Sequence, residues 1–125
     1  MAHVTRFEDL IAWQKARVLT KSIYQLTGQM PFSRDFGLKD QIQRSTVSVM
    51  SNIAEGFERD RLTEFHQFLS VAKSSCAETR SLLYVAYDIN YIAEEVFKAR
   101  LTQAEEVGRI IGGLRASVQR EIATS

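Results

Sequence analysis

The chain has 125 residues, of which 45% are hydrophobic and 25% charged, and its formal net charge is +1. This length suits one domain, and the composition excludes a disordered or collagen-like chain. We expect no membrane-spanning segment and no signal peptide, because no long apolar run occurs. Cys76 is the only cysteine, which excludes an internal disulfide and a cysteine-cluster metal site. Residues 1–125 are therefore expected to form one cytoplasmic domain.

The first helix is expected over residues 9–27. Its apolar residues alternate in steps of four and three, as one helical face requires. This seam consists of Ala12, Ala16, Leu19, Ile23, Leu26 and Met30. Gly28 as a cap and Pro31 as a stop are expected to end the helix.

The second helix is expected from Ser33 or Asp35 to Ala54, because Ser33 can cap a helix N-terminus and Asp35 suits the first turn. Gly56 is expected to cap its C-terminus. One face of this helix is formed by Leu38, Ile42, Ser45, Val49 and Asn52.

The third helix is expected over residues 61–90, with Asp60 as a candidate cap and Asn90 as a candidate end. Its seam consists of Phe65, Phe68, Ala72, Ser75, Thr79, Leu82, Ala86 and Ile89. The fourth helix is expected over residues 94–121. Its stripe consists of Leu101, Ala104, Val107, Ile111, Leu114 and Val118.

Three glycines, Gly108, Gly112 and Gly113, lie inside the fourth predicted helix. They either weaken it, at up to about 1 kcal/mol each relative to alanine, or let another backbone approach closely. No segment alternates with the period of a strand. Four long helices joined by three short connections predict an all-α fold, an antiparallel up-and-down four-helix bundle.

A search for catalytic residues favours a protein that is not an enzyme. His66 is the only histidine outside the N-terminal tail that holds His3, and Thr63 stands where a di-iron bundle would need glutamate. We therefore predict no catalytic site, no metal site and no cofactor. One alternative stays open, because Arg61 and His66 have the Arg-x4-His spacing of HEPN ribonucleases. Leu62 departs from that pattern, since a polar residue usually follows the arginine.

Polar residues interrupt the core face of the second helix. Ser45 and Asn52 lie seven residues apart on that face, and a buried amide is costly unless it is hydrogen-bonded. They either bond locally to backbone carbonyls or pin the second helix to the third in one register. The candidate polar seam consists of Arg44, Ser45, Asn52, Glu55 and Glu78.

Apolar residues also occupy the opposite face of the second helix, and three tyrosines follow one another along the third. A helix that is apolar nearly all round is buried on two sides, and tyrosine suits protein interfaces. We therefore predict a homo-oligomer, closed as a ring because the two patches differ. The candidate interface consists of Val47, Met50, Ala54, Phe57, Tyr84, Tyr87 and Tyr91.

Binding of RNA or of a ribonucleoprotein is the alternative function. Its candidate contacts are Arg6, Lys15, Arg17, Lys21, Arg59 and Arg61. Clustering of these cations on one face would favour nucleic-acid binding, whereas carboxylates interspersed among them would favour a scaffold.

Several motifs together resemble one known family over nearly the whole chain. The most specific is Gln41–Arg44 followed by Ser48 and then Ser51–Gly56. The chain departs from the family at Ser74, where the family often has glycine before a serine. The other matching stretches are Phe7–Leu10, Trp13–Ala16, Met30-Pro31, Phe36–Leu38, Glu64-Phe65, Phe68-Leu69, Ala72 and Glu78. The chain resembles the small bundle proteins encoded in intervening sequences of bacterial 23S ribosomal RNA genes, also called the S23 ribosomal protein family.

This resemblance implies fold and assembly rather than an activity. Members are cytoplasmic four-helix bundles, and homopentamers are known among them. A similar bundle serves as the accessory protein of diversity-generating retroelements and binds nucleic acid, but that relative is strongly basic. The resemblance therefore implies that the first partner of this chain is itself, with RNA or another protein as a further partner and no membrane.

Overall fold

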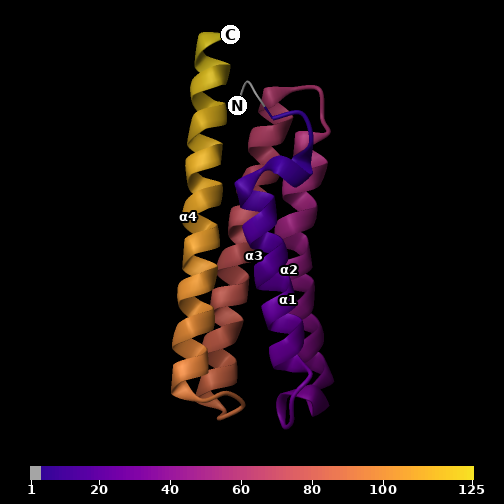
Figure 1. Ribbon diagram of the computed structural model, residues 1–125, viewed down its shortest axis with the longest axis vertical. Coiled ribbons are helices and arrows are strands. Elements are labelled where there is room, and N and C mark those ends of the chain that lie inside the picture. Colours follow the sequence, from indigo (N-terminus) through magenta and orange to yellow (C-terminus); the bar gives the residue numbers. More distant parts are fainter. Residues whose placement is uncertain (1–3) are drawn as a thin grey trace.

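The computed structural model describes residues 4–125, so the expectations for His3 lie outside it. Four helices run alternately up and down (Figure 1). They are α1 (Ile11–Thr27), α2 (Phe36–Phe57), α3 (Leu62–Asp88) and α4 (Glu94–Thr124). Two short 3-10 turns, Phe7–Asp9 (η1) and Phe32–Arg34 (η2), precede α1 and α2. The part of the chain described holds no strand, so the predicted all-α bundle is confirmed.

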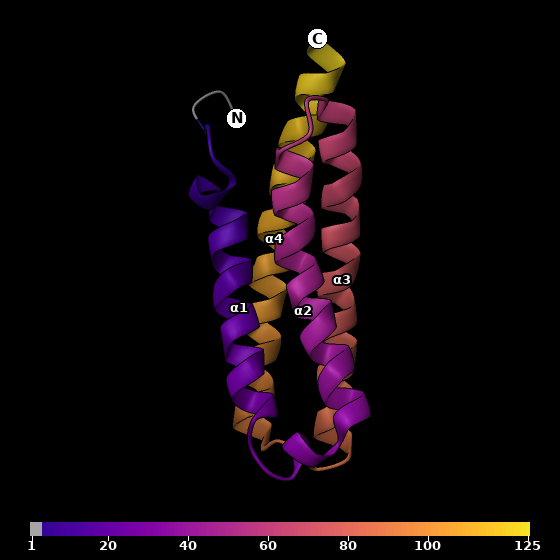
Figure 2. The same cartoon turned by 90° about the vertical axis from the view of Figure 1, so that its right-hand side faces the viewer.

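The helices pack as a closed ring of neighbours around one core. Consecutive helices contact each other, and α1 also contacts α4 (Figures 1 and 2). The α2–α3 and α3–α4 contacts are the most extensive, because these helices are longer than α1. None of these helices in residues 4–125 is long and apolar enough to span a membrane.

The core consists largely of the predicted seams. Leu19, Ile42, Ala72 and Ile111, one from each helix, are completely buried. The predicted seams were wrong at their ends, where Met30 and Ile89 are exposed. Both residues lie just past the last turn of a helix, where the chain turns away from the neighbouring helix.

Three predicted helix boundaries differ from the structure for local reasons. Residues 7–9 form a 3-10 turn, so α1 begins at Ile11 rather than at Asp9. Asp35, not Ser33, caps α2, because its carboxylate accepts the backbone N–H of Leu38 at 3.1 Å. Asp60 does not cap α3; Arg61 precedes that helix and makes no capping side-chain bond.

Gly56 is not the predicted C-terminal cap. It lies inside α2, which continues to Phe57, and it is buried against α3. A Cβ atom at Gly56 would lie 2.5 Å from the Cβ of Phe68 and 3.0 Å from the Cδ1 of Phe65. Glycine is therefore required by the close approach of the two helices.

The end of α3 forms a Schellman motif. Asn90 has a positive φ of 64° and its N–H bonds the carbonyl of Tyr87, while the N–H of Tyr91 bonds the carbonyl of Ala86. Asparagine tolerates this left-handed conformation better than most residues. The predicted end of the helix near Asn90 is thus confirmed, and the chain turns directly into α4.

The three glycines of α4 do not interrupt it, and the helix runs past the predicted end at Glu121 to Thr124. Gly108 and Gly112 face α3, at the distance of ordinary van der Waals contact for an added Cβ, whereas Gly113 faces open space. Because Gly108 and Gly112 have no side chains, a hollow remains between α3 and α4.

Candidate functional site

Hydroxyl groups form the polar contact between α2 and α3. The hydroxyls of Ser45 and Thr79 lie 2.7 Å apart in the buried interface, and those of Ser48 and Ser75 lie 2.8 Å apart. Asn52 is half-buried and donates its amide to the carbonyl and hydroxyl of Ser48, within α2. Ser45 thus links the two helices, while Asn52 bonds locally.

The charged members of the predicted polar seam are not part of this contact. Arg44, Glu55 and Glu78 are exposed on the outer faces of their helices. Glu78 accepts one long hydrogen bond from Gln41, at 3.5 Å, and Arg44 has no partner within residues 4–125. Hydroxyl groups satisfy the buried positions instead, because they can bond each other without burying a charge.

The predicted interface residues of α2 differ in how far their side chains are exposed to solvent. Val47 is 38% exposed, whereas Met50, Ala54 and Phe57 are half-buried, and Met50 and Phe57 pack against the core. The ring of Phe57 meets that of Phe65 edge to face, at 5.8 Å between centroids. Only part of the second apolar face of α2 is therefore open to solvent.

The tyrosines do not form one open row. Tyr87 stacks on Phe97 with 4.5 Å between ring centroids, and Tyr84 meets the same ring edge to face at 5.0 Å while staying exposed. Tyr91 is half-buried and donates its hydroxyl to the Asp35 carboxylate at 2.9 Å, which raises the pKa of Tyr91. These rings serve the contact of α3 with α4 and with the α1–α2 connection.

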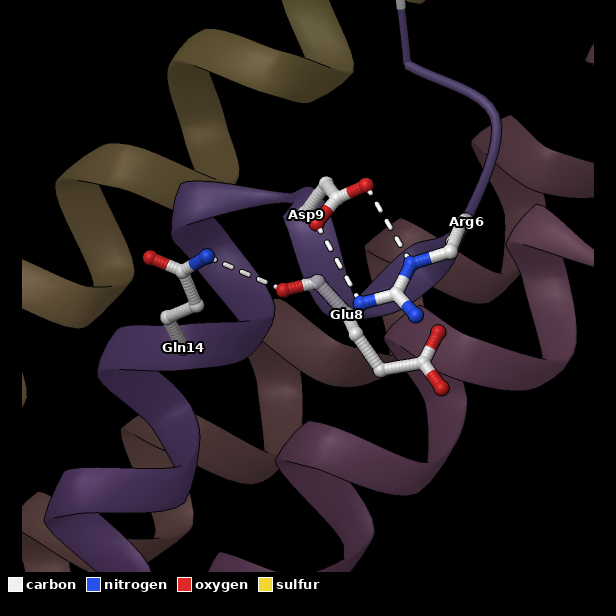
Figure 3. A network of polar contacts seen from close by, with 4 residues as sticks. All are labelled: Arg6, Glu8, Asp9 and Gln14. Carbon is white, nitrogen blue, oxygen red and sulfur yellow. Dashed lines mark hydrogen bonds and ion pairs between the residues drawn. The ribbon is translucent and has the colours of Figure 1, made fainter.

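The predicted cations of the first helix lie among carboxylates. The guanidinium of Arg6 faces the carboxylate of Asp9, with Glu8 beside them (Figure 3). These residues line a hollow of about 720 Å³ together with Arg17 and Lys21. Lys15 lies outside that hollow and pairs with Glu106 of α4 at 3.6 Å. The interspersed carboxylates offset the positive charge that a nucleic acid would need.

Of the two predicted cations at the α2–α3 turn, one has partners within residues 4–125 and the other stands alone there. Arg59 lies over the ring of Phe68 at 5.0 Å and pairs with Glu64 at 4.0 Å. Arg61 precedes α3 and is exposed, and no hydrogen bond joins it to the half-buried His66. The backbone of Arg61 is extended and lies outside α3, so helical spacing does not place its side chain beside that of His66.

A basic groove lies between α3 and α4, and sequence reasoning missed it. Lys73 and Arg80 of α3 face Arg109 and Arg115 of α4 across two adjoining cavities of about 310 and 340 Å³. The groove passes over Cys76, whose thiol donates to the Ala104 carbonyl at 3.1 Å. Burial raises the pKa of Cys76 against the opposing effect of the Arg80 charge, so the thiol stays neutral.

A signal for this groove was present in the sequence. Lys73 and Arg80 are seven residues apart, hence on one helical face, and Gly108 and Gly112 are four apart. The sequence alone does not show that this face of α3 lies opposite these glycines of α4. Elsewhere in residues 4–125, no group of three or more His, Cys, Asp or Glu side chains could hold a metal ion.

Comparison with known proteins supports the fold and the family. A crystal structure of a protein with unknown function from the S23 ribosomal protein family of Bacteroides thetaiotaomicron superposes with a TM-score of 0.77. It is 20% identical, and the match covers 84% of this chain and 98% of that one. A search of curated proteins finds no significant match. The model of the 23S rRNA-intervening sequence protein family matches residues 8–113. The chain therefore belongs to the 23S rRNA-intervening sequence protein family.

Proposed function

We propose that this chain is a non-enzymatic cytoplasmic protein that assembles with copies of itself and acts as an interaction scaffold. The observation that carries the proposal is an exposed apolar surface along α1 and α2, here called the α1–α2 flank. It consists of the exposed Tyr24, Phe36 and Val47 and of the half-buried Met50 and Ala54 beside them. The single, buried thiol of Cys76 fits a reducing compartment.

The helical register supports treating the α1–α2 flank as one surface. Thr20 bonds the carbonyl of Thr46, and Gln43 bonds the hydroxyl of Thr27. Tyr24 lies one turn from both threonines of α1, and Val47 lies one turn from Gln43 of α2, so these two side chains lie along the same helix–helix seam. Tyr24 is 46% exposed and Val47 38% exposed.

Two further residues extend the α1–α2 flank along α2. Phe36 precedes Val47 by eleven residues and Ala54 follows it by seven, which are three and two turns of a helix. Phe36 is 68% exposed, unusual for so large an apolar side chain near other exposed apolar groups. Burial of this strip against another copy would remove it from water.

A different apolar surface on α3 supports a ring rather than a twofold dimer. Tyr84, Val85 and Ile89 are exposed near the C-terminal end of α3. Contact between two unlike surfaces is heterologous and either closes into a ring or grows into a filament. Five subunits are what the resemblance to the family implies.

The test is the mass of the purified chain in sedimentation-velocity and light-scattering experiments. We expect a mass several times 14.2 kDa, lowered in Val47→Asp because a charge would be buried at the contact. Val71→Asp is the matched control, since Val71 is 49% exposed on α3 outside both surfaces. Met50→Asp is unsuitable, because Met50 also packs against the core of its own subunit.

A monomeric mass for the unchanged chain would overturn the proposal. Equal masses for Val47→Asp and the unchanged chain, or an equal loss in Val71→Asp, would remove the α1–α2 flank as the interface. The non-enzymatic part is tested separately by incubation with RNA. Cleavage that disappears in His66→Ala would replace the scaffold with the nuclease alternative.

A further inference from the structure

The two cavities between α3 and α4 form one continuous groove. Lys73 and Arg80 line both cavities, which therefore adjoin each other. The groove extends at least from Ser70 to Arg80, ten residues of α3, which is about 15 Å of helix. It is long enough for an extended ligand rather than a single small ion.

The backbone of α4 makes this groove hollow. Gly108 and Gly112 lie one turn apart and present no side chain to α3. A Cβ atom added at Gly108 would lie 3.8 Å from the Sγ of Cys76, and one added at Gly112 would lie 3.6 Å from the Cε of Lys73. Larger side chains at these two positions would occupy the space that the groove now leaves open.

The charge of the groove is strongly one-sided. Four cations, Lys73, Arg80, Arg109 and Arg115, line it with one carboxylate, Glu105. This is a local excess of three positive charges in a chain whose net charge is +1. None of the four cations is ion-paired within residues 4–125. Arg6, which precedes α1, and Lys15 of α1 differ in this respect, since both have carboxylate partners.

One arginine is held in place at the end of the groove. The Nε of Arg115 donates to the Ser70 hydroxyl at 2.7 Å, and that hydroxyl donates to the His66 carbonyl at 3.1 Å. A guanidinium fixed in this way loses less conformational entropy when it binds an anion. Ser74 adds a second hydroxyl to the lining.

Arginine, lysine and hydroxyl groups together are the donors that proteins use to bind phosphate oxygens. Among the described residues that line the groove there is no aromatic ring on which a base could stack. Recognition would therefore involve the phosphates and not the bases. We propose that the α3–α4 groove binds a row of phosphate groups, supplied either by a single-stranded polynucleotide backbone or by a short inorganic polyphosphate.

This site is separate from the α1–α2 flank, so it does not depend on the proposed self-assembly. The probes are a fluorescein-labelled oligouridylate, followed by anisotropy, and inorganic tripolyphosphate, followed by calorimetry and by competition. Displacement of the oligouridylate by tripolyphosphate would show that both occupy the groove. Binding of only one of them would identify the source of the phosphates.

The test variant is Arg80→Gln with Arg109→Gln, which removes two groove charges and leaves the Arg115–Ser70 bond intact. The control is Arg34→Gln with Arg44→Gln, which removes two exposed charges elsewhere. We expect the test variant to lose at least about tenfold in affinity and to reduce the salt slope of oligouridylate binding by about 1.4, since each single-strand phosphate contact contributes about 0.7. The control should retain both values.

A second variant tests the shape of the groove without changing the net charge of the chain. Gly112→Leu fills the hollow without changing any charge, and it should weaken binding as well. Circular dichroism melting checks that each variant is folded. The proposal is overturned if neither probe binds, if the control loses as much affinity as the test variant, or if folded Gly112→Leu binds as the unchanged chain does.

Discussion

Ser45 and Thr79 join α2 to α3 through a buried hydrogen bond, with 2.7 Å between their hydroxyl oxygens. Each hydroxyl also lies within hydrogen-bond distance of a backbone carbonyl of its own helix, that of Ile42 for Ser45 and that of Ser75 for Thr79. Since each hydroxyl has a single hydrogen, one of them donates across the interface and the other donates to its own carbonyl. The link therefore satisfies two polar groups inside the core without burying a charge. It fixes how far α2 can slide along α3, because only one register places the two hydroxyls opposite each other.

A double-mutant cycle should detect this link. Ser45→Ala and Thr79→Val should each destabilise the protein, and their coupling free energy in urea unfolding should be about 0.5–1.5 kcal/mol. Ser70→Ala is the distant control, since nine residues, or about 13 Å of α3, separate it from Thr79. Its effect should add to that of Ser45→Ala within about 0.5 kcal/mol. Strict additivity of Ser45→Ala and Thr79→Val would show that the bond contributes nothing.

Glycine-to-alanine substitutions should have opposite signs at Gly56 and Gly113. At Gly56 the new Cβ would lie 2.5 Å from the Cβ of Phe68, so α2 and α3 must separate, and we expect a loss of about 1–3 kcal/mol. At Gly113 the new Cβ meets nothing within 4 Å, and higher helix propensity should stabilise α4 by up to about 1 kcal/mol. Thermal and urea unfolding measure both. Stabilisation by Gly56→Ala would contradict the close approach.

The Tyr91–Asp35 bond should make stability depend on alkaline pH. The bond raises the pKa of Tyr91 above its unfolded value of about 10, so its contribution is complete below that pH. The contribution is lost as the pH rises through the higher folded pKa. Tyr91→Phe should lower the melting temperature at pH 8 and remove this part of the alkaline decline. Parallel melting curves of Tyr91→Phe and the unchanged chain from pH 8 to 11 would contradict it.

Two phenylalanines should respond differently to truncation. Phe97 is 7% exposed and contacts the rings of both Tyr84 and Tyr87, so Phe97→Ala should cost about 3–5 kcal/mol in urea unfolding. Phe36 lies on the surface of the subunit, so Phe36→Ala should change the stability of the dilute subunit by at most about 0.5 kcal/mol. It should instead lower the sedimenting mass, because Phe36 belongs to the α1–α2 flank. A large loss of subunit stability in Phe36→Ala would show that this ring is part of the core.

Much of the bundle was predictable because helical periodicity is a local property. Ala16, Leu19 and Ile23 recur on one face whatever the rest of the chain does, and that face became core. The same reasoning failed at Gly56, which the sequence pattern predicts to be the C-terminal cap of a helix. Only the rings of Phe65 and Phe68, supplied by another helix, show why glycine stands there.

The candidate sites were less predictable than the fold. Tyr87 and Tyr91 lie opposite a predicted apolar seam, which suggested an open surface, but Phe97 and Asp35 cover them in the folded chain. The prediction that Arg44 belongs to the polar seam was wrong for a related reason. Helical spacing gives the side of a helix on which a residue lies, but not which neighbour packs against that side.

The sequence by itself determined the helices, their apolar faces, the bundle and the family to which the chain belongs. The helices and their apolar faces depend on residues within a few turns of one another, and the family depends on short motifs spread along the chain. The tertiary structure alone decided that Lys73 and Arg80 would face Arg109 and Arg115 across two glycines. The two cations of α3 lie 29 to 42 positions before those of α4, and their charges add up to one groove only when α3 and α4 pack antiparallel.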